Sequence, residues 1–447
     1  MTYEHDTIVA PATASGGALS VIRLSGADAV AIADRLFRGR RPLSACPSHT
    51  AHFGTIESEG QVIDEVVATL YRAPKSYTGD DTVEFSCHGS SYILREVLHQ
   101  AVKAGARMAE PGEFTRRAYL SGRLDLAQAE AVADLIASNS QQAHRIATHQ
   151  LRGGYSSALD ALREELLSLT ALLELELDFG EEEVEFADRK QLQTTMQKIA
   201  AEIDRLRHSY RLGNALKEGV PVAIVGAPNV GKSTLLNQLL QEDRAMVSEI
   251  AGTTRDVIEE QLVIEGVLFR ILDTAGLRMT DDRLEQMGIE RTLRTIERAQ
   301  IVIRMEEVST TEKPTEEDFT LRDDQLLIRV VNKIDTAPER ALPSDGIAIS
   351  ARTGEGIERL RHALREAVPT SDEEQTLVTS ERHYEALTSA AEALKEALHG
   401  LETGLPTDLL SEEIRTVIAA IGTITARGTI LPTEVLAHIF GHFCIGK

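Results

Sequence analysis

The sequence predicts a multidomain protein that combines α/β with all-α architecture. Residues 1–117 and 213–373 alternate short apolar runs with amphipathic stretches, as strands and helices do. Residues 118–212 and 374–447 instead carry apolar residues at helical spacing alone. A chain of 447 residues is also long for a single hydrophobic core. We therefore expect an N-terminal α/β domain, a central helical domain built from two chain segments, and a second α/β domain inserted between those segments.

In the N-terminal domain, three short apolar runs predict strands at 7–10, 21–24 and 66–70. The stretch ADAVAIADRLF has the apolar spacing of a helix. These elements indicate a small mixed α/β domain over residues 1–117.

The helical domain begins in a region rich in Ala, Leu, Glu and Arg, from LDLAQAEAVADLI at 124–136 onward. Two long antiparallel helices are predicted by SSALDALREELLSLTALLELELDF and by QLQTTMQKIAAEIDRLRHSY, which follows an acidic segment. The helical pattern returns after residue 374, in ERHYEALTSAAEALKEALHGLE and LLSEEIRTVIAAIG. We expect one helical domain formed by 118–212 and 374–447, with 213–373 inserted.

The charge and the cysteines restrict the class of protein. A formal net charge of -23 argues against broad neutralisation of nucleic-acid phosphates, so any RNA contact must be local or supplied by a partner. The start lacks a basic region followed by an apolar stretch, and no long apolar run occurs, which predicts a cytoplasmic protein without a membrane span. Cys46, Cys87 and Cys444 are widely separated, which fits neither a disulfide framework nor a metal site.

The nonapeptide GAPNVGKST at 226–234 has the spacing of a phosphate-binding loop. The apolar run VPVAIVG at 220–226, which predicts a short buried strand, precedes it and the helical stretch KSTLLNQLL follows, so a helix N-terminus would point its amides at the phosphates. Lys232 would reach the outer phosphates, and the Ser233 hydroxyl would bind Mg²⁺. Taken alone, the loop could also be a fortuitous Gly-rich turn. Its chemistry does not require the amide side chain of Asn229.

Two further motifs follow in the order that a nucleotide site needs. ILDTAG at 271–276 predicts a strand that ends in Asp273, suited to hold magnesium through water, with the amide of Gly276 near the γ-phosphate. Thr253 and Thr254 lie between the two motifs, where a loop could place a hydroxyl on the metal. We expect Thr254 to join Ser233 as a Mg²⁺ ligand.

The motif VVNKID at 330–335 predicts which base is bound. An Asp carboxylate accepts from two donors at once, and guanine offers its N1–H and exocyclic amine side by side where adenine does not. Asp335 therefore selects GTP, while Asn332 would tie this loop to the phosphate loop and the stem of Lys333 would pack on the base. Together the motifs predict a Ras-like P-loop GTPase domain. The residues expected to contact GTP are Asn229, Val230, Gly231, Lys232, Ser233, Thr234, Ser248, Thr253, Thr254, Asp273, Thr274, Ala275, Gly276, Asn332, Lys333, Asp335, Ser350, Ala351 and Arg352.

One familiar catalytic part is replaced. Many switch GTPases orient the attacking water with a Gln directly after the Asp-containing motif, but this chain has Leu277 there. A leucine cannot hold a water molecule. Glu285, in the acidic stretch just downstream, is our candidate for that task, and a solvated charge on a helix is the alternative.

The motifs GAPNVGKST, AGTTRD, DTAGLR, NKID and SART resemble the G domain of the MnmE (TrmE) family of tRNA-modification GTPases. DTIVA, SYTGDDTVEFSCHG, PGEFTRRAYLSGRLDLAQAEAVADLI and the terminal FCIGK resemble the same family, so the likeness spans essentially the whole chain. The resemblance implies a homodimer that forms a heterotetramer with an FAD-dependent, MnmG/GidA-like partner, which alone carries the FAD. The complex would place an aminomethyl or carboxymethylaminomethyl group on carbon 5 of the wobble uridine in certain tRNAs.

The resemblance also implies a folate site in an N-terminal domain that mediates dimerisation. A tetrahydrofolate derivative, in its 5-formyl or methylene form, would be bound by Arg23, Glu84, Arg123 and Lys447. Glu84 suits a pterin, which presents a ring N–H beside an amino group; half of a surface salt bridge is the alternative reading. The thiol of Cys444 would act in the modification, and its alternative is a packed cysteine.

The resemblance also implies that hydrolysis is assisted by a potassium ion, which would sit against the phosphates when two G domains meet. The resemblance implies that K⁺ is coordinated by Asn229, Ser248, Ile250 and Thr253, which gives the amide of Asn229 a task. Two other functions remain open from the residues alone: a GTPase switch in ribosome assembly, and a helical scaffold whose nucleotide site is only structural.

Overall fold

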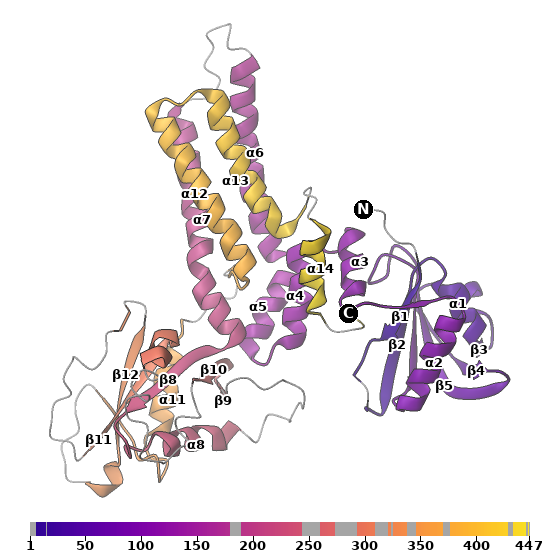
Figure 1. The fold of residues 1–447 in the computed structure, drawn as a ribbon, viewed down its shortest axis with the longest axis horizontal. Helices are drawn as coiled ribbons and strands as arrows, with labels where there is room; N and C mark the ends of the chain where they lie inside the picture. Colours follow the sequence, from indigo (N-terminus) through magenta and orange to yellow (C-terminus); the bar gives the residue numbers. More distant parts are fainter. Residues whose placement is uncertain are drawn as a thin grey trace. The chain divides into compact units, whose positions relative to one another are not determined.

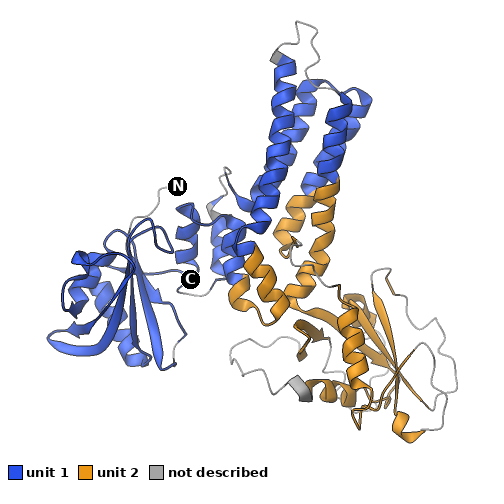
Figure 2. Cartoon of the chain, turned by 180° about the vertical axis from the view of Figure 1, so that it is seen from behind, with its two compact units in different colours: residues 1–133, 150–200, 389–447 blue, residues 134–149, 201–388 orange. Residues whose placement is uncertain are grey.

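The computed structural model places most of the chain in two compact units (Figure 2). The first unit comprises residues 1–133, 150–200 and 389–447, and the second comprises 134–149 and 201–388. The structure describes residues 6–14, 16–178, 189–243, 260–272, 293–308, 321–322, 325–337, 346–369, 376–427, 432–443 and 446. Within these residues no helix is both long and apolar enough to cross a membrane.

The first unit contains a seven-stranded sheet with the strand order β3-β4-β5-β6-β2-β1-β7 (Figure 1). Neighbouring strands are antiparallel except β1 and β7, which are parallel. The strands are β1 (Ile8–Pro11), β2 (Leu19–Ser25), β3 (Phe37–Gly39), β4 (Thr50–Ser58), β5 (Gln61–Tyr71), β6 (Thr82–His88) and β7 (Arg107–Met108). Helices α1 (Ala29–Leu36) and α2 (Ser91–Lys103) pack on one face of this sheet and share its core.

Alternation along the central strands decides which side chains face that core. In β6, Val83 and Phe85 are fully buried, whereas Glu84 between them points to the opposite face. In β2, Ile22 and Leu24 are buried in the same core, and Arg23 lies between them. Because the antiparallel register pairs Arg23 with Glu84, the sheet places these two charged residues side by side on its outer face.

Helices complete the first unit. They are α3 (Glu113–Leu120), the first part of α4 (Leu126–Ala137), α6 (Gly154–Asp178), the first part of α7 (Arg189–Glu218), the last part of α12 (Glu381–Thr403), α13 (Thr407–Thr425) and α14 (Thr433–Gly441). Phe440 and Phe443 pack with Leu126 in one core cluster. Gly112 has φ 67°, and a Cβ there would lie 2.5 Å from the carbonyl oxygen of Phe440, so this close approach requires glycine.

The second unit is built on a six-stranded sheet with the order β13-β12-β11-β8-β10-β9. The strands are β8 (Val220–Gly226), β9 (Glu260–Ile264), β10 (Val267–Ile271), β11 (Ile301–Glu307), β12 (Leu326–Asn332) and β13 (Ile347–Ala348). Only β9 and β10 are antiparallel among the described strand pairs. Most of α5 (Gln141–Leu151) and all of α8 (Lys232–Asp243) and α11 (Ile357–Glu366) belong to this unit. Strand β8 lies inside the sheet, between β11 and β10.

Strand β8 covers the residues that the sequence predicted as a buried strand, and the fold class is confirmed as α/β combined with all-α parts. Helix α7 runs through residue 213 and ends at Glu218. At Gly213 a Cβ would lie 2.2 Å from the carbonyl oxygen of Val378, so a glycine inside the helix lets this segment pack closely. The domain boundaries at 117, 212 and 373 stay a prediction.

Candidate functional site: a phosphate-binding loop and a sheet-face cavity

The GAPNVGKST segment turns directly from the end of β8 into α8, which begins at Lys232. Gly231 has φ 103°, and a Cβ there would lie 2.3 Å from the side-chain nitrogen of Asn332. Asn229 is also left-handed, with φ 61°, a conformation that Asn tolerates better than most residues. The backbone geometry is thus a second reason for an Asn at this position, besides any ligand that its amide binds.

Lys232 lies against the loop from which it starts. Its Nζ donates to the carbonyl oxygens of Gly226 at 2.7 Å and Ala227 at 3.0 Å. Burial lowers the pKa of this ammonium group. Ser233 is half-buried in the first turn of α8, Thr234 is exposed, and Val230 is buried.

Asn332 connects three loops of this edge of the sheet. Its side-chain Nδ2 donates to the carbonyl oxygen of Val230 at 2.7 Å, and its Oδ1 accepts from the N–H of Ala351 at 2.9 Å. The residue is only 3% exposed, so both bonds are shielded from water. The phosphate loop, the NKID loop and the SAR loop are therefore held together by one side chain.

Asp335 lies beside the same loops with both carboxylate oxygens engaged. The Oγ of Ser350 donates to its Oδ1 at 2.8 Å, and the guanidinium of Arg352 lies 2.9 Å from its Oδ2. The hydrogen bond from Ser350, followed by the charge of Arg352, lowers the pKa of Asp335. The group therefore stays an ionised acceptor pair at neutral pH. Lys333 has φ 65°, and its Nζ lies 2.9 Å from Oε2 of Glu307.

Several residues singled out from the sequence lie outside the described residues. They are Ser248, Ile250, Thr253, Thr254, Asp273, Thr274, Ala275, Gly276, Glu285, Cys444 and Lys447. Among the described residues, the contacts of Asn332 bring together the phosphate loop, the NKID loop and the SAR loop.

A second candidate site lies on the outer face of the first unit's sheet. Arg23 Nε donates to Oε1 of Glu84 at 2.7 Å, and both side chains are partly buried. The guanidinium of Arg23 also lies over the rings of Tyr77 and Phe114, at 5.3 and 5.5 Å from their centroids. Glu84 therefore does form a salt bridge, which was the alternative to a folate contact in the sequence analysis. A carboxylate has further lone pairs, so Glu84 can accept hydrogen bonds from a ligand as well as from Arg23.

A cavity of about 300 Å³ opens in the same unit. Its lining residues are His49, Tyr71, Lys75, Ser76, Tyr77 and Arg123. Arg123 donates to the carbonyl oxygen of Pro74 at 2.8 Å. Burial and the negative charge of Glu84 raise the pKa of Tyr71, which links Glu84 electrostatically to this cavity. Sequence reasoning missed His49, Tyr71 and Lys75, whereas it predicted Arg123 as a folate-binding residue and quoted the motif that contains Ser76 and Tyr77.

The C-terminal tail reaches the same sheet. Gly446 accepts a hydrogen bond on its carbonyl oxygen from Arg23 Nη1 at 3.4 Å. Its φ is 94°, and a Cβ at this position would lie 1.9 Å from the carbonyl oxygen of Pro11. Only glycine fits there, so the glycine of the FCIGK tail is matched to the end of β1.

Comparisons with known proteins match this chain to one family along its whole length. Residues 126–444 match the family described as "MnmE helical domain", and residues 7–123 match "GTP-binding protein TrmE N-terminus". The chain is 48% identical over 462 residues to "tRNA modification GTPase MnmE" of Cytophaga hutchinsonii, which covers 100% of this chain and 99% of the relative. It is 47% identical over 470 residues to the protein of the same name from Porphyromonas gingivalis, with 100% and 99% covered. The chain therefore belongs to the MnmE family of tRNA-modification GTPases.

Proposed function

We propose that this GTPase, with an FAD-dependent partner, installs an aminomethyl or carboxymethylaminomethyl group on carbon 5 of the wobble uridine in certain tRNAs. One observation carries the proposal: the chain combines loops around Asp335 that suit guanine with a separate cavity near Glu84 that suits a reduced pterin. A nucleotide switch and a one-carbon donor are the two components that such a modification needs.

The nucleotide is proposed to be GTP, bound through its phosphates by the loop from Asn229 to Thr234. The Gly231 backbone and the ammonium group of Lys232 lie where a helix N-terminus attracts anions. Mg²⁺ would be held by the hydroxyls of Ser233 and Thr254, with Asp273 acting through water. Ser233 lies half-buried in the first turn of α8, next to the phosphate loop, which supports its proposed role as a Mg²⁺ ligand.

Guanine is proposed to be read by Asp335 and held by the neighbouring loops. The ionised carboxylate accepts from the N1–H and the exocyclic amine, and the Arg352 contact at 2.9 Å helps to keep it charged. Asn332 ties the base side to the phosphate side, so that both ends of the nucleotide meet a preformed site. Lys333 would lie along the base, and Ser350 and Ala351 complete the loop.

For hydrolysis we propose assistance by K⁺ at Asn229, with oxygens from Ser248, Ile250 and Thr253. The exposed side chain of Asn229 fits this task, since its amide oxygen is a hard donor on the surface of the phosphate loop. A monovalent cation there would offset the negative charge that develops on the phosphates in the transition state. Glu285 would position the attacking water in place of the glutamine that Leu277 replaces.

The pterin end of a tetrahydrofolate derivative is proposed to bind near Glu84. A tetrahydrofolate derivative would supply the one-carbon unit when bound. Arg23 orients the Glu84 carboxylate through its 2.7 Å bond, and Arg123 places a positive charge in the wall of the cavity for the ligand's glutamate tail. Lys447 would add a second cation. The packing of Gly446 supports a role for the FCIGK tail, in which the thiol of Cys444 acts in the modification.

A homodimer through the N-terminal domain is supported by exposed apolar side chains on its sheet. Phe53 and Val67 face each other across β4 and β5 and are 67% and 39% exposed. Exposed apolar side chains that lie together are a feature of surfaces that bind another protein chain, so this pair is our candidate for part of the dimer contact. The FAD-dependent partner would join this dimer to form a heterotetramer.

The test is a nucleoside mass spectrum of tRNA from cells that lack this protein. Unmodified wobble uridine should accumulate, and the parent protein should remove it. Glu84→Gln should restore little modification although it hydrolyses GTP normally, whereas the exposed Glu65→Gln in the same sheet should restore it fully. Unchanged wobble uridines in the cells lacking the protein would overturn the proposal.

A further inference from the structure

Helix α5 lies far from the phosphate loop in the sequence but belongs largely to the same compact unit. Residues 134–149 fall in the second unit together with 201–388. In α5, Ile146 is buried in one core cluster with Ile264 and Val267, the last residue of β9 and the first of β10. A helix that the sequence assigns to the helical domain is therefore part of the core of the nucleotide-binding unit.

The N-terminus of α5 is capped in part by the turn between β9 and β10. The N–H of Gln142, in the first turn of α5, donates to the carbonyl oxygen of Gly266 at 3.2 Å. The N–H of Ala143 donates to the Oγ of Ser140 at 3.1 Å. Because the first N–H groups of a helix have no acceptor within the helix, both bonds help to define where α5 begins. One acceptor belongs to the residue before the helix, and the other belongs to the hairpin of the sheet.

The turn fits against α5 so closely that it requires glycine. Glu265 and Gly266 have φ of 47° and 78°, the left-handed pair typical of a two-residue hairpin turn. A Cβ on Gly266 would lie 2.8 Å from the Oε1 and 3.1 Å from the Cβ of Gln141. A single added methyl group would therefore press the turn and the first residue of α5 apart.

A second contact holds the same segment of the chain to the end of α7. The Nζ of Lys217 lies 2.8 Å from Oδ1 of Asp134, and both side chains are partly buried. Asp134 is in α4, and Lys217 is in the last turn of α7, shortly before β8 begins. Residues 134–149 are thus attached to the nucleotide-binding unit at two places, the hairpin turn and the end of α7.

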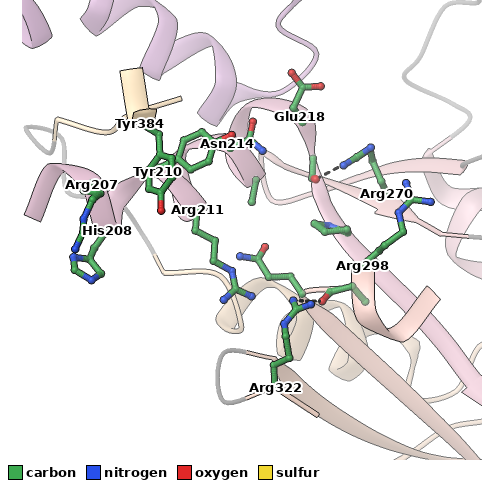
Figure 3. Close-up of a pocket in the computed structure, with 15 residues that line it drawn as sticks. Arg207, His208, Tyr210, Arg211, Asn214, Glu218, Arg270, Arg298, Arg322 and Tyr384 are labelled. Carbon is green, nitrogen blue, oxygen red and sulfur yellow. Dashed lines mark hydrogen bonds between the residues drawn. The ribbon is translucent and has the colours of Figure 1, made fainter. Parts of the chain in front are cut away.

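The junction between α7 and β8 also borders a cavity of about 600 Å³ (Figure 3). The arginines in the wall of this cavity interact within the protein. Arg207 lies 2.8 Å from Oδ1 of Asp204, and Arg270 of β10 donates to the carbonyl oxygen of Gly219 at 3.3 Å. These arginines therefore serve as internal ties of the unit, and the bond of Arg270 fixes β10 to the start of β8.

The β9–β10 hairpin connects the two segments that are proposed to hold magnesium. AGTTRD at 251–256 comes shortly before β9, which begins at Glu260, and β10 ends at Ile271, shortly before Asp273. The turn lies at the other end of the hairpin, and the chain from Gly266 to Asp273 spans roughly 20 Å when extended. Among the described strands, β9 is an edge strand that pairs with β10 alone. Such a strand depends on contacts outside the sheet for its position, and α5 provides one.

We propose that α5 positions the β9–β10 hairpin for GTP hydrolysis by holding its turn at the N–H of Gln142. Gly266 and Gln142 are positioning residues, because the turn lies at the end of the hairpin away from the proposed magnesium ligands. The proposal rests on the Mg²⁺ roles proposed for Thr254 and Asp273. It goes further by giving α5 a part in the GTPase reaction.

The test is steady-state GTP hydrolysis by the full chain in potassium chloride with Mg²⁺. Gly266→Ala should lower kcat at least tenfold and leave KM within twofold of the parent, because the phosphate loop and the base loops are unchanged. Gly60→Ala is the matched control and should hydrolyse GTP as the parent does. It lies in the Glu59–Gly60 turn of the first unit, where φ is 50° and 83° and a Cβ would meet nothing within 4 Å. The control therefore adds similar backbone strain without a new contact.

A second substitution separates the contact with α5 from strain within the turn. Gln141→Gly removes the atoms that the new methyl group would meet, while the N–H of Gln142 remains. By itself Gln141→Gly should keep kcat within twofold of the parent. Combined with Gly266→Ala, it should raise kcat at least threefold above that of Gly266→Ala alone. Strain confined to the turn would give no such recovery.

Hydrogen exchange reports the contact directly. The amide hydrogen of Gln142 should exchange at least tenfold faster in Gly266→Ala than in the parent, and close to the parent rate in the double variant. If Gly266→Ala does not fold, Ser140→Ala weakens the same end of α5 from the side of the helix. This variant should lower kcat at least threefold with KM unchanged.

The proposal is overturned by parent-like kcat in a Gly266→Ala protein whose Gln142 amide has lost its protection, or by a lost rate that Gln141→Gly does not recover. Equal exchange of this amide in the parent and in folded Gly266→Ala would overturn it as well. Thr254→Ala separates the two levels of the account, since it should abolish hydrolysis while the Gln142 amide stays protected. Normal hydrolysis by Thr254→Ala would contradict the Mg²⁺ role on which the proposal rests.

Discussion

The side-chain amide of Asn332 donates to the carbonyl oxygen of Val230 at 2.7 Å, so one residue of the NKID motif fixes the phosphate loop. The same side chain accepts from Ala351 and is almost fully buried. The loops for base and phosphate are thereby coupled before any nucleotide binds. The first prediction concerns this coupling.

Asn332→Ala removes both bonds and leaves the carbonyl of Val230 and the N–H of Ala351 without this partner. Leaving buried polar groups unsatisfied costs about 1–3 kcal/mol, which corresponds to roughly 5-fold to 150-fold in affinity. We expect GDP affinity to fall by such a factor in equilibrium titrations. Asn237→Ala, at an exposed position of α8, is the control and should bind as the parent does. Parent-like affinity of Asn332→Ala would show that the loops are held by other contacts.

Asp335→Asn should change which base is bound. An amide presents a donor to the donors of guanine, so GTP affinity should drop by at least about 100-fold. Xanthine carries a carbonyl where guanine has its amine, so XTP should bind the variant better than GTP does. Competition between the two nucleotides on one preparation measures the switch. A variant that still prefers GTP would remove Asp335 from the base site.

Asn229 needs a substitution that respects its backbone. Because φ is 61°, Asn229→Ala would add strain as well as remove the amide, whereas Asn229→Gly removes only the amide. We expect the parent to hydrolyse GTP faster in potassium than in sodium chloride at equal ionic strength. Asn229→Gly should lose this advantage at a cost of about 2.7–4 kcal/mol, or roughly 10² to 10³ in rate, with little change in nucleotide affinity.

Glu285→Ala is the counterpart of that experiment. It should also slow hydrolysis, but its remaining rate should still respond to potassium, because the cation site is intact. Equal rates in the two salts for the parent protein would exclude the cation mechanism and leave Asn229 as a residue of the left-handed turn.

A buried ion-pair network in the first unit predicts how stability depends on pH. Glu113 is 1% exposed and contacts Arg107 at 2.8 Å and Arg117 at 2.9 Å. Burial alone raises the pKa of Glu113, but the hydrogen bonds from Arg107, from the backbone N–H of Glu110 and from Arg117 together outweigh it, and the net pKa is lowered. Its contribution to stability is therefore complete above the ordinary value of 4.5 and is lost as the pH falls through the lowered value.

Thermal unfolding followed from pH 7 to pH 3 measures this contribution. Glu113→Gln should destabilise the first unit at pH 7, by about 3 kcal/mol for a broken buried pair, and should lose less stability than the parent on acidification. The exposed Glu110→Gln should behave like the parent. If Glu113→Gln and the parent lose stability in parallel, the network is not the source of the acid sensitivity.

The positions of the loops at 226–234 and 330–335 could be predicted from the sequence because their motifs are local, whereas the ligand contacts of their residues stay a prediction. Strand β8 has the predicted residues, since a short apolar run before a Gly-rich turn has few other solutions. The left-handed backbone of Asn229 could not be read from the motif, which reports residue types and not dihedral angles.

Contacts between distant residues were the harder part. Arg23 and Glu84 are 61 positions apart and meet only through the register of β2 with β6. Among the arginines that line the cavity at the start of β8, Arg207 and Arg211 are neighbours on α7, but Arg270, Arg298 and Arg322 come from later segments, so no single window of sequence contains the set. The run of α7 past Gly213 also depended on a tertiary contact, because glycine alone disfavours a helix.

The central claim is that the guanine site around Asp335 drives tRNA modification. The most direct measurement is the fraction of modified wobble uridine in cells that lack this protein and carry either the parent, Asp335→Asn or the control Asn237→Ala at equal protein levels. We predict full restoration by the parent and by Asn237→Ala, and no restoration by Asp335→Asn, which cannot use cellular GTP. Full modification in cells that carry only Asp335→Asn would contradict the account.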